Sequence, residues 1–330
     1  MILTLKDKSN NNSILIVIIT LSLSALALIL SPVISPDYYF YENDYNNFLQ
    51  NSDSQDYFYE LLKRIFRLFV SFDLFYFLLV STIIFFKIKL FSYFSVSYIY
   101  FLPFYIVSFY ILHDLIQFRL SLGLVLFLYS IYLYENKHLK KALIVFFISI
   151  FTHNSIIILL IPILVSKFSY KFIVIFLILI GLFFFNIDFE LAYEFIIDSN
   201  LLEFSAKNAD YLFELSKVKF ELFFSKLAWL FLLNIILLKF IFFKYKIKSK
   251  LMRFEKFVFI SFIFGIFFLS IFSDNMVLSN RLFELLIFYL PLMQGLCFYQ
   301  LMKRSHMISM LYFSCLIIIN FILFTNPLIT

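Results

Sequence analysis

The sequence predicts an all-α fold, a polytopic integral membrane helical bundle of about nine to ten spans. Of its 330 residues, 63% are apolar and only 15% are charged, and the mean hydropathy is +0.96. Soluble domains are nearer half apolar and a quarter charged. Apolar runs of about eighteen or more residues recur along the chain, and this is the length that a bilayer's hydrocarbon core demands. A β-barrel would show short alternating segments instead.

The first span is expected at about 14–34. Lys6 and Lys8 precede it and its apolar core is too long for a cleaved signal peptide, so the N-terminus is expected in the cytoplasm. The polar segment 36–62 has no Lys or Arg before Lys63 and is expected to be the first outer loop. Further spans are expected near 65–86, 90–112, 115–134, 171–187, 223–243, 256–273, 282–302 and 306–324.

Basic residues cluster in turns between these runs, as they do in cytoplasmic loops. Lys87 and Lys89 mark one such turn, and others are expected around 137–141, 244–256 and 303–304. The acidic segment 188–222 is expected to be a large outer loop that contains an interfacial helix. The chain is thus predicted to form a single integral membrane domain, 1–330.

The segment 142–166 is apolar except at its centre, Thr152-His153-Asn154-Ser155, and it admits two topologies. It is either one ordinary span or a re-entrant hairpin with its tip at His153-Asn154. Basic residues flank both of its ends, which favours the hairpin. Irregular backbone at membrane depth is tolerated only where protein or a water-filled cavity surrounds it.

Ionisable residues near the ends of spans are the candidates for chemistry, because such groups are costly in a membrane. Arg119 is either a snorkelling arginine that Asp114 neutralises or a planar donor for phosphate oxygens. Arg281 is either the partner of Glu284 or a second such donor. His153, with Asn154 and Ser155 beside it, predicts a polar pocket whose imidazole accepts a proton.

The first outer loop combines carboxylates with tyrosines. Asp44 and Asp56 could bind sugar hydroxyls, and Tyr45 could stack on a sugar face. The alternative is an acidic, solvated loop with interfacial tyrosines.

The ordered set of four motifs resembles the EpsG/Wzy-like family of polysaccharide polymerases. The motifs are "NDYNNF" with Asp44, "QFRLSL" with Arg119, "FTHNSIIILL" with His153 and "SNRLFELLIFYLP" with Arg281. That family often has a glutamate after the first-loop aspartate, and here Asp56-Tyr57 or Glu60 stands in its place.

The resemblance implies an O-antigen or related surface-polysaccharide polymerase at the outer face of the bacterial inner membrane. Its substrates would be oligosaccharide repeat units linked to undecaprenyl diphosphate, which is also the leaving group. Arg119 and Arg281 would bind the diphosphate and His153 or Asp44 would act as the base. Tyr45, Asp56, Asn154 and Ser155 would contact the glycan.

Two other classes remain open, a transporter or flippase of lipid-linked oligosaccharide and a lipid-linked sugar acyltransferase. No cofactor, metal site or nucleic-acid partner is predicted. Besides the lipid bilayer and the lipid-linked oligosaccharides, family analogy adds a chain-length regulator protein as a partner.

Overall fold

The computed structural model describes residues 11–35, 37–47, 56–94, 97–166, 257, 260–265, 267–268 and 276–325. All regular structure within these ranges is helical, which confirms the predicted all-α membrane fold. Five of the helical segments are long and apolar enough to cross a membrane: 13–34, 72–94, 98–116, 118–135 and 281–302. The predicted spans 171–187 and 223–243 and the outer loop 188–222 lie outside the described residues.

By its internal contacts the chain divides into two compact units, one made of 1–156 and 291–330 and the other of 157–290. The first unit opens with α1 (Asn11–Ile34), α2 (Tyr38–Asn46), α3 (Tyr57–Arg67) and α4 (Phe72–Phe94). It continues with α5 (Tyr98–Tyr105), the π-helix η2 (Ile106–Ile116), α6 (Phe118–Glu135) and α7 (Leu139–Thr152). It closes with α15 (Leu290–Met302), which begins at the unit boundary, and α16 (His306–Thr325).

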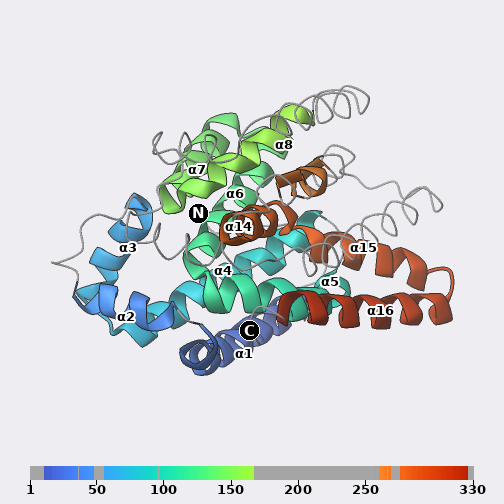
Figure 1. Cartoon of the computed structure of the whole chain (residues 1–330), viewed down its shortest axis with the longest axis horizontal. Coiled ribbons are helices and arrows are strands. Elements are labelled where there is room, and N and C mark those ends of the chain that lie inside the picture. The colour runs from blue at the N-terminus through green and yellow to red at the C-terminus, as the bar shows by residue number, and fades with distance from the viewer. Residues whose placement is uncertain are drawn as a thin grey trace. The chain divides into compact units, whose positions relative to one another are not determined.

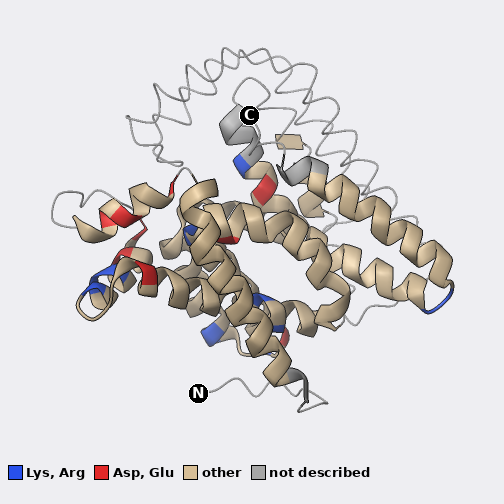
Figure 2. Ribbon diagram, turned by 90° about the horizontal axis from the view of Figure 1, so that it is seen from below, with Lys and Arg blue, Asp and Glu red and all other residues tan. Residues whose placement is uncertain are grey.

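The long apolar helices pack on one another because their side chains are apolar on every face. α1 lies against α4, α6 lies against both α4 and α7, and α16 lies against η2. The short helices α2 and α3 extend from one end of this unit (Figure 1). Acidic and basic residues gather at the left of Figure 2.

The predicted turn at Lys87 and Lys89 is wrong. Both residues lie inside α4, which continues to Phe94. Lys87 is buried and pairs with Asp114 of η2, so its charge is neutralised inside the bundle. Consequently the second and third spans begin later than expected, at Phe72 and Tyr98.

The described part of the segment expected to be the first outer loop is largely helical. α2 and the beginning of α3 lie within 36–62, and the polar residues between them belong partly to 48–55, outside the described residues. Tyr38, Tyr41 and Tyr45 recur at helical spacing and are buried, so α2 packs one aromatic face against the bundle.

In the second unit, the described residues form η3 (Asn154–Leu159, from Ile157 onward), α8 (Leu160–Val165) and α14 (Met276–Ile287). Part of 256–273, where a span is predicted, is also helical. Gly265 lies against the ring of Phe283, and Phe257 packs edge-on against Tyr289.

Gly295 allows α15 to approach α5 closely. A Cβ built on Gly295 would lie 2.6 Å from the Cα of Phe101 and 2.5 Å from its Cβ. Because backbone would have to move, we expect Gly295→Ala to destabilise the folded protein by roughly 1–3 kcal/mol, the usual cost of overpacking. Thermal unfolding in detergent measures this.

The matched control is Gly123→Ala in α6. Its added methyl would meet the side chain of Ile156 at 3.1 Å, and the carbonyl oxygen of Ser149 at 3.4 Å, an ordinary contact distance. That side chain can shift, and alanine is the better helix former by about 1 kcal/mol. Equal loss of thermal stability in the two variants would contradict the prediction.

Candidate functional site

Arg119 lies in the first turn of α6, between two tyrosine rings of the preceding short helices. Its Cζ is 4.8 Å from the ring centroid of Tyr41 in α2 and 5.6 Å from that of Tyr59 in α3. A cation over an aromatic face is attracted by the ring's quadrupole. The rings hold the guanidinium between them, and 23% of the side chain remains exposed.

Asp56 pairs with this arginine. Its Oδ2 accepts a hydrogen bond from Nη1 of Arg119 at 3.1 Å. The contact is single rather than bidentate, and Nε of Arg119 is buried without a hydrogen-bond partner among the described residues. Part of the donor set of this guanidinium is therefore not engaged by Asp56.

The carboxylate of Asp56 also joins Arg119 to the polar break after α7. It accepts a hydrogen bond from the backbone N–H of Asn154. Burial raises the pKa of Asp56, against the opposing effect of the Arg119 charge; Glu60 nearby also raises it. The packing of α3 against α7 brings these groups together.

The break itself occurs where the sequence places the tip of the hairpin. α7 ends at Thr152, His153 is extended (φ −158°, ψ 114°), and Asn154 begins a 3-10 turn. The Nδ1 of His153 and the Oγ of Ser155 are 2.7 Å apart, and both side chains are partly exposed. Thr152 is buried and donates to the carbonyl of Ile148, so it is a structural residue of α7. The return of a second arm stays a prediction.

Asp44, expected as an alternative base, belongs to a separate buried cluster. Its Oδ2 is 2.6 Å from Nζ of Lys63, which is 2.8 Å from Oε1 of Glu60. Lys63 is fully buried and also lies 5.9 Å from the ring centroid of Tyr59. Asp44 therefore compensates a buried ammonium that would otherwise be costly.

Tyr45 makes other contacts, and Arg281 belongs to the second unit. Tyr45 is 1% exposed, stacks on Phe75 at 5.0 Å and donates to the carbonyl of Val70. It holds α2 against α4 and presents no open face for a sugar. Arg281 is an exposed residue of α14 in the second unit, and its predicted contact with a diphosphate stays a prediction.

The expectation that Asp114 neutralises Arg119 is wrong. Asp114 binds Lys87, at 2.7 Å, whereas Arg119 binds Asp56. Asp114 and Arg119 are close in sequence, but the helix breaks between them at Gln117 (φ −113°, ψ 50°). A sequence distance of five residues across such a break does not place two side chains on one face.

The two rings around Arg119 are the part of the site that sequence reasoning missed. Tyr41 and Tyr59 stand among the first-loop tyrosines, which the sequence offers equally as sugar platforms or interfacial anchors. The helical spacing of Tyr38, Tyr41 and Tyr45 was a signal for a buried face. Burial raises the pKa of Tyr59 well above its ordinary value, so its hydroxyl stays protonated.

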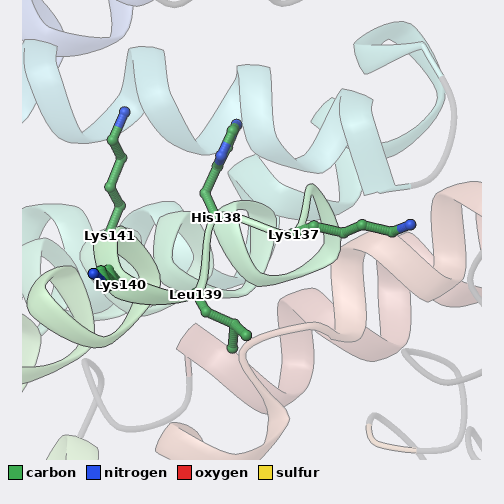
Figure 3. Close-up of a pocket in the computed structure, with 5 residues that line it drawn as sticks. All are labelled: Lys137, His138, Leu139, Lys140 and Lys141. Carbon is green, nitrogen blue, oxygen red and sulfur yellow. The ribbon is translucent and has the colours of Figure 1, made fainter.

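A shallow pocket of about 280 Å³, open to the surface, lies at the turn between α6 and α7 (Figure 3). Its lining is basic except for one leucine and consists of Lys137, His138, Leu139, Lys140 and Lys141. It is at the opposite end of α7 from His153. This is the basic turn around 137–141 that the sequence predicts to be cytoplasmic.

A family model described as "EpsG family" matches residues 13–329 of the chain. Comparison with curated proteins and comparison with solved structures each gave no match.

Proposed function

Because the chain belongs to the EpsG family of Wzy-like polysaccharide polymerases, we propose that it joins oligosaccharide repeat units linked to undecaprenyl diphosphate. The reaction takes place at the outer face of the bacterial inner membrane and builds O-antigen or a related surface polysaccharide. The observation that carries this proposal is Arg119, a partly exposed guanidinium with an uncommitted buried Nε, beside the polar break at His153–Ser155.

The reaction moves a growing glycan from its lipid diphosphate to a hydroxyl of a new lipid-linked unit. The hydroxyl oxygen attacks the anomeric carbon, the bond from that carbon to the diphosphate oxygen breaks, and the diphosphate leaves with the bonding electrons. Negative charge therefore grows on the leaving group. Arg119 stabilises it, because a fixed cation in a site of low dielectric favours developing charge.

The proton of the acceptor hydroxyl must pass to a base. We assign this role to His153, whose imidazole is of the type that accepts protons near neutral pH. Asp44, the alternative, is engaged by Lys63. Asn154 and Ser155 adjoin His153, and Ser155 hydrogen-bonds the imidazole, so we assign contacts with the sugars to these two residues.

Diphosphate that binds at Arg119 would share or replace its bond to Asp56. The single 3.1 Å contact and the free Nε favour such an exchange, since a phosphate group can accept from two donors at once. Asp56 then remains beside Asn154, among the groups that would surround the sugars.

The surface glycan of a strain lacking this gene tests the function. We expect a gel profile in which the polymer ladder is gone and single repeat units remain on the carrier or the surface lipid. Loss of every repeat from the surface, with lipid-linked units trapped inside, would identify a transporter instead. An unchanged ladder would contradict both functions.

The side of the membrane is tested at Asn154. We expect a cysteine introduced as Asn154→Cys, in a chain with Cys297→Ser and Cys315→Ser, to react with an impermeant thiol reagent from the outer side. The residue is partly exposed, so the reagent can reach it. His138→Cys at the basic turn is the control, and it should react only after the membrane is opened. The reverse pattern would contradict the outer location.

A further inference from the structure

A buried ion pair lies inside the helical bundle, apart from the Arg119 site. Nζ of Lys87 in α4 is 2.7 Å from Oδ1 of Asp114 in η2, and their side chains are 3% and 0% exposed. Asp114 also accepts hydrogen bonds from the hydroxyls of Tyr105 in α5 and Ser121 in α6. One carboxylate thus joins four consecutive helical elements.

Two main-chain carbonyls at the end of the π-helix also accept hydrogen bonds from side chains of other helices. The carbonyl of Asp114 accepts from the hydroxyl of Tyr76 at 3.2 Å, and the carbonyl of Leu115 accepts from Ser31 of α1 at 3.1 Å. Ser31 and Tyr76 are themselves 2.5 Å apart. π-helical segments are uncommon and often occur at functional sites. Here side chains from two other helices fix the place where the π-helix ends.

We call the segment Asp114–Gln117 and its side-chain partners the junction. Arg119 lies two residues beyond it, in the first turn of α6. Ser121, one half-turn further, is bound through its side chain to Asp114 and through its N–H to the carbonyl of Gln117 at 3.0 Å. Both hydrogen bonds are made by Ser121. They tie the first turn of α6, which carries Arg119, to the junction.

Stability alone does not explain an ion pair at this place. Replacing a buried pair by apolar residues of similar volume is often neutral or stabilising, whereas removing one partner is strongly destabilising. The carboxylate accepts hydrogen bonds from three side chains on three different helices, and an apolar side chain could accept none of them.

We propose that Asp114, Lys87 and Ser121 are positioning residues for Arg119, holding the start of α6 so that the guanidinium meets the diphosphate. This inference rests on the proposed function of Arg119. Lys87 neutralises Asp114, Asp114 holds Ser121, and Ser121 fixes the turn that carries Arg119. A displacement of about 1 Å can cost a hundredfold in rate, so loosening this turn lowers turnover.

The test is Ser121→Ala, which removes the link to α6 but leaves the ion pair in place. The substrate is lipid-linked repeat unit extracted from the strain lacking this gene, and rates are measured with purified protein in vesicles. We expect kcat to fall about fivefold to tenfold with KM little changed, because the loss is in the alignment of the developing charge.

Ser130→Ala is the matched control. Ser130 is also a buried serine of α6, but it donates to the carbonyl of Phe127 in its own helix. Its removal should leave kcat within about twofold. Equal effects of the two substitutions would overturn the proposal.

A second experiment asks whether Ser121 acts through Arg119. In an Arg119→Lys background, which keeps some activity, Ser121→Ala should cause no further loss, because the planar donor set that it aligns is already gone. Independent, multiplying losses would overturn the positioning role. The double variant Lys87→Met/Asp114→Leu removes both charges together with the acceptor of Ser121 and should lower kcat at least as much as Ser121→Ala; normal kcat in that variant would also overturn it.

These outcomes are distinct from a failure of the proposed function. If wild-type protein does not polymerise the extracted units, or if Arg119→Ala is fully active, the function of the site is wrong. If Arg119 is required but Ser121→Ala behaves like Ser130→Ala, only the positioning inference fails.

Discussion

Arg119→Ala is expected to abolish surface polymer while the protein remains in the membrane. The substitution removes the cation that faces the developing diphosphate charge, and loss of one such donor typically lowers turnover by about 10²–10³. The rings of Tyr41 and Tyr59 and the carboxylate of Asp56 stay, so the site keeps its walls but gains net negative charge. Polymer on gels and initial rates with extracted lipid-linked units measure the loss.

Two variants make this result specific. Arg119→Lys should restore activity only in part, because an ammonium is a point charge without the planar pair of donors. Arg67→Ala removes an exposed arginine at the end of α3, which donates to the carbonyl of Asn46, and should leave polymer formation nearly normal. Full activity of Arg119→Ala would remove the diphosphate role from the site.

Asp56→Asn is expected to change binding and turnover in opposite directions. The wild-type carboxylate occupies Arg119 and must give way to an incoming anion, so removing its charge should tighten anion binding by about tenfold, or 1.4 kcal/mol. Turnover should fall nevertheless, because in the proposed function Asp56 is among the groups that contact the sugars. Sulfate, measured by its effect on thermal unfolding, serves as the binding probe.

The pH dependence of sulfate binding tests the same exchange. The pKa of Asp56 is raised by burial, so the carboxyl takes up a proton at a higher pH than an ordinary aspartate does. As the pH falls through that raised value, neutral Asp56 releases Arg119 and sulfate should bind more tightly to the wild-type protein. Sulfate keeps its charge between about pH 4 and pH 8, so the change belongs to the protein.

Glu60 lies near Asp56, and the other charged or titratable groups of this region are linked to Asp56 through Glu60 or Asn154; these groups serve as the comparison. Glu60, Asp44 and Lys63 remain in Asp56→Asn, as does His153 beyond Asn154. If the pH dependence is that of Asp56, the variant should bind sulfate with the same affinity throughout the acidic range. An unchanged pH profile in the variant would assign the titration to one of these other groups and contradict the exchange.

Much of the fold follows from local properties of the sequence. Runs of apolar residues predict where helices cross a membrane, and the spans at 13–34, 118–135 and 281–302 agree with the structure closely. Lys87 misled the prediction because a lysine in an apolar run usually marks a turn. Its partner Asp114 is 27 residues away, and a pairing of that range leaves no local signal.

The site was predictable in its members but not in its contacts. Arg119, Asp56 and Asn154 each stand out as polar residues at helix ends, yet the sequence does not show that the carboxylate bridges the other two. For the same reason Asp44 looked as suitable a base as His153. Its neighbour Lys63 lies three residues beyond Glu60, a spacing that could have indicated their ion pair.

The pair of Lys87 and Asp114 also bears on how the protein enters the membrane. α4 leaves the ribosome before η2, so Lys87 is made before its counter-ion. A lone lysine deep in a span disfavours insertion by roughly 3 kcal/mol. The stretch from Phe72 to Ile116 should therefore be released into lipid as a preformed helical pair, and α4 expressed alone should insert poorly unless Lys87 is replaced by leucine.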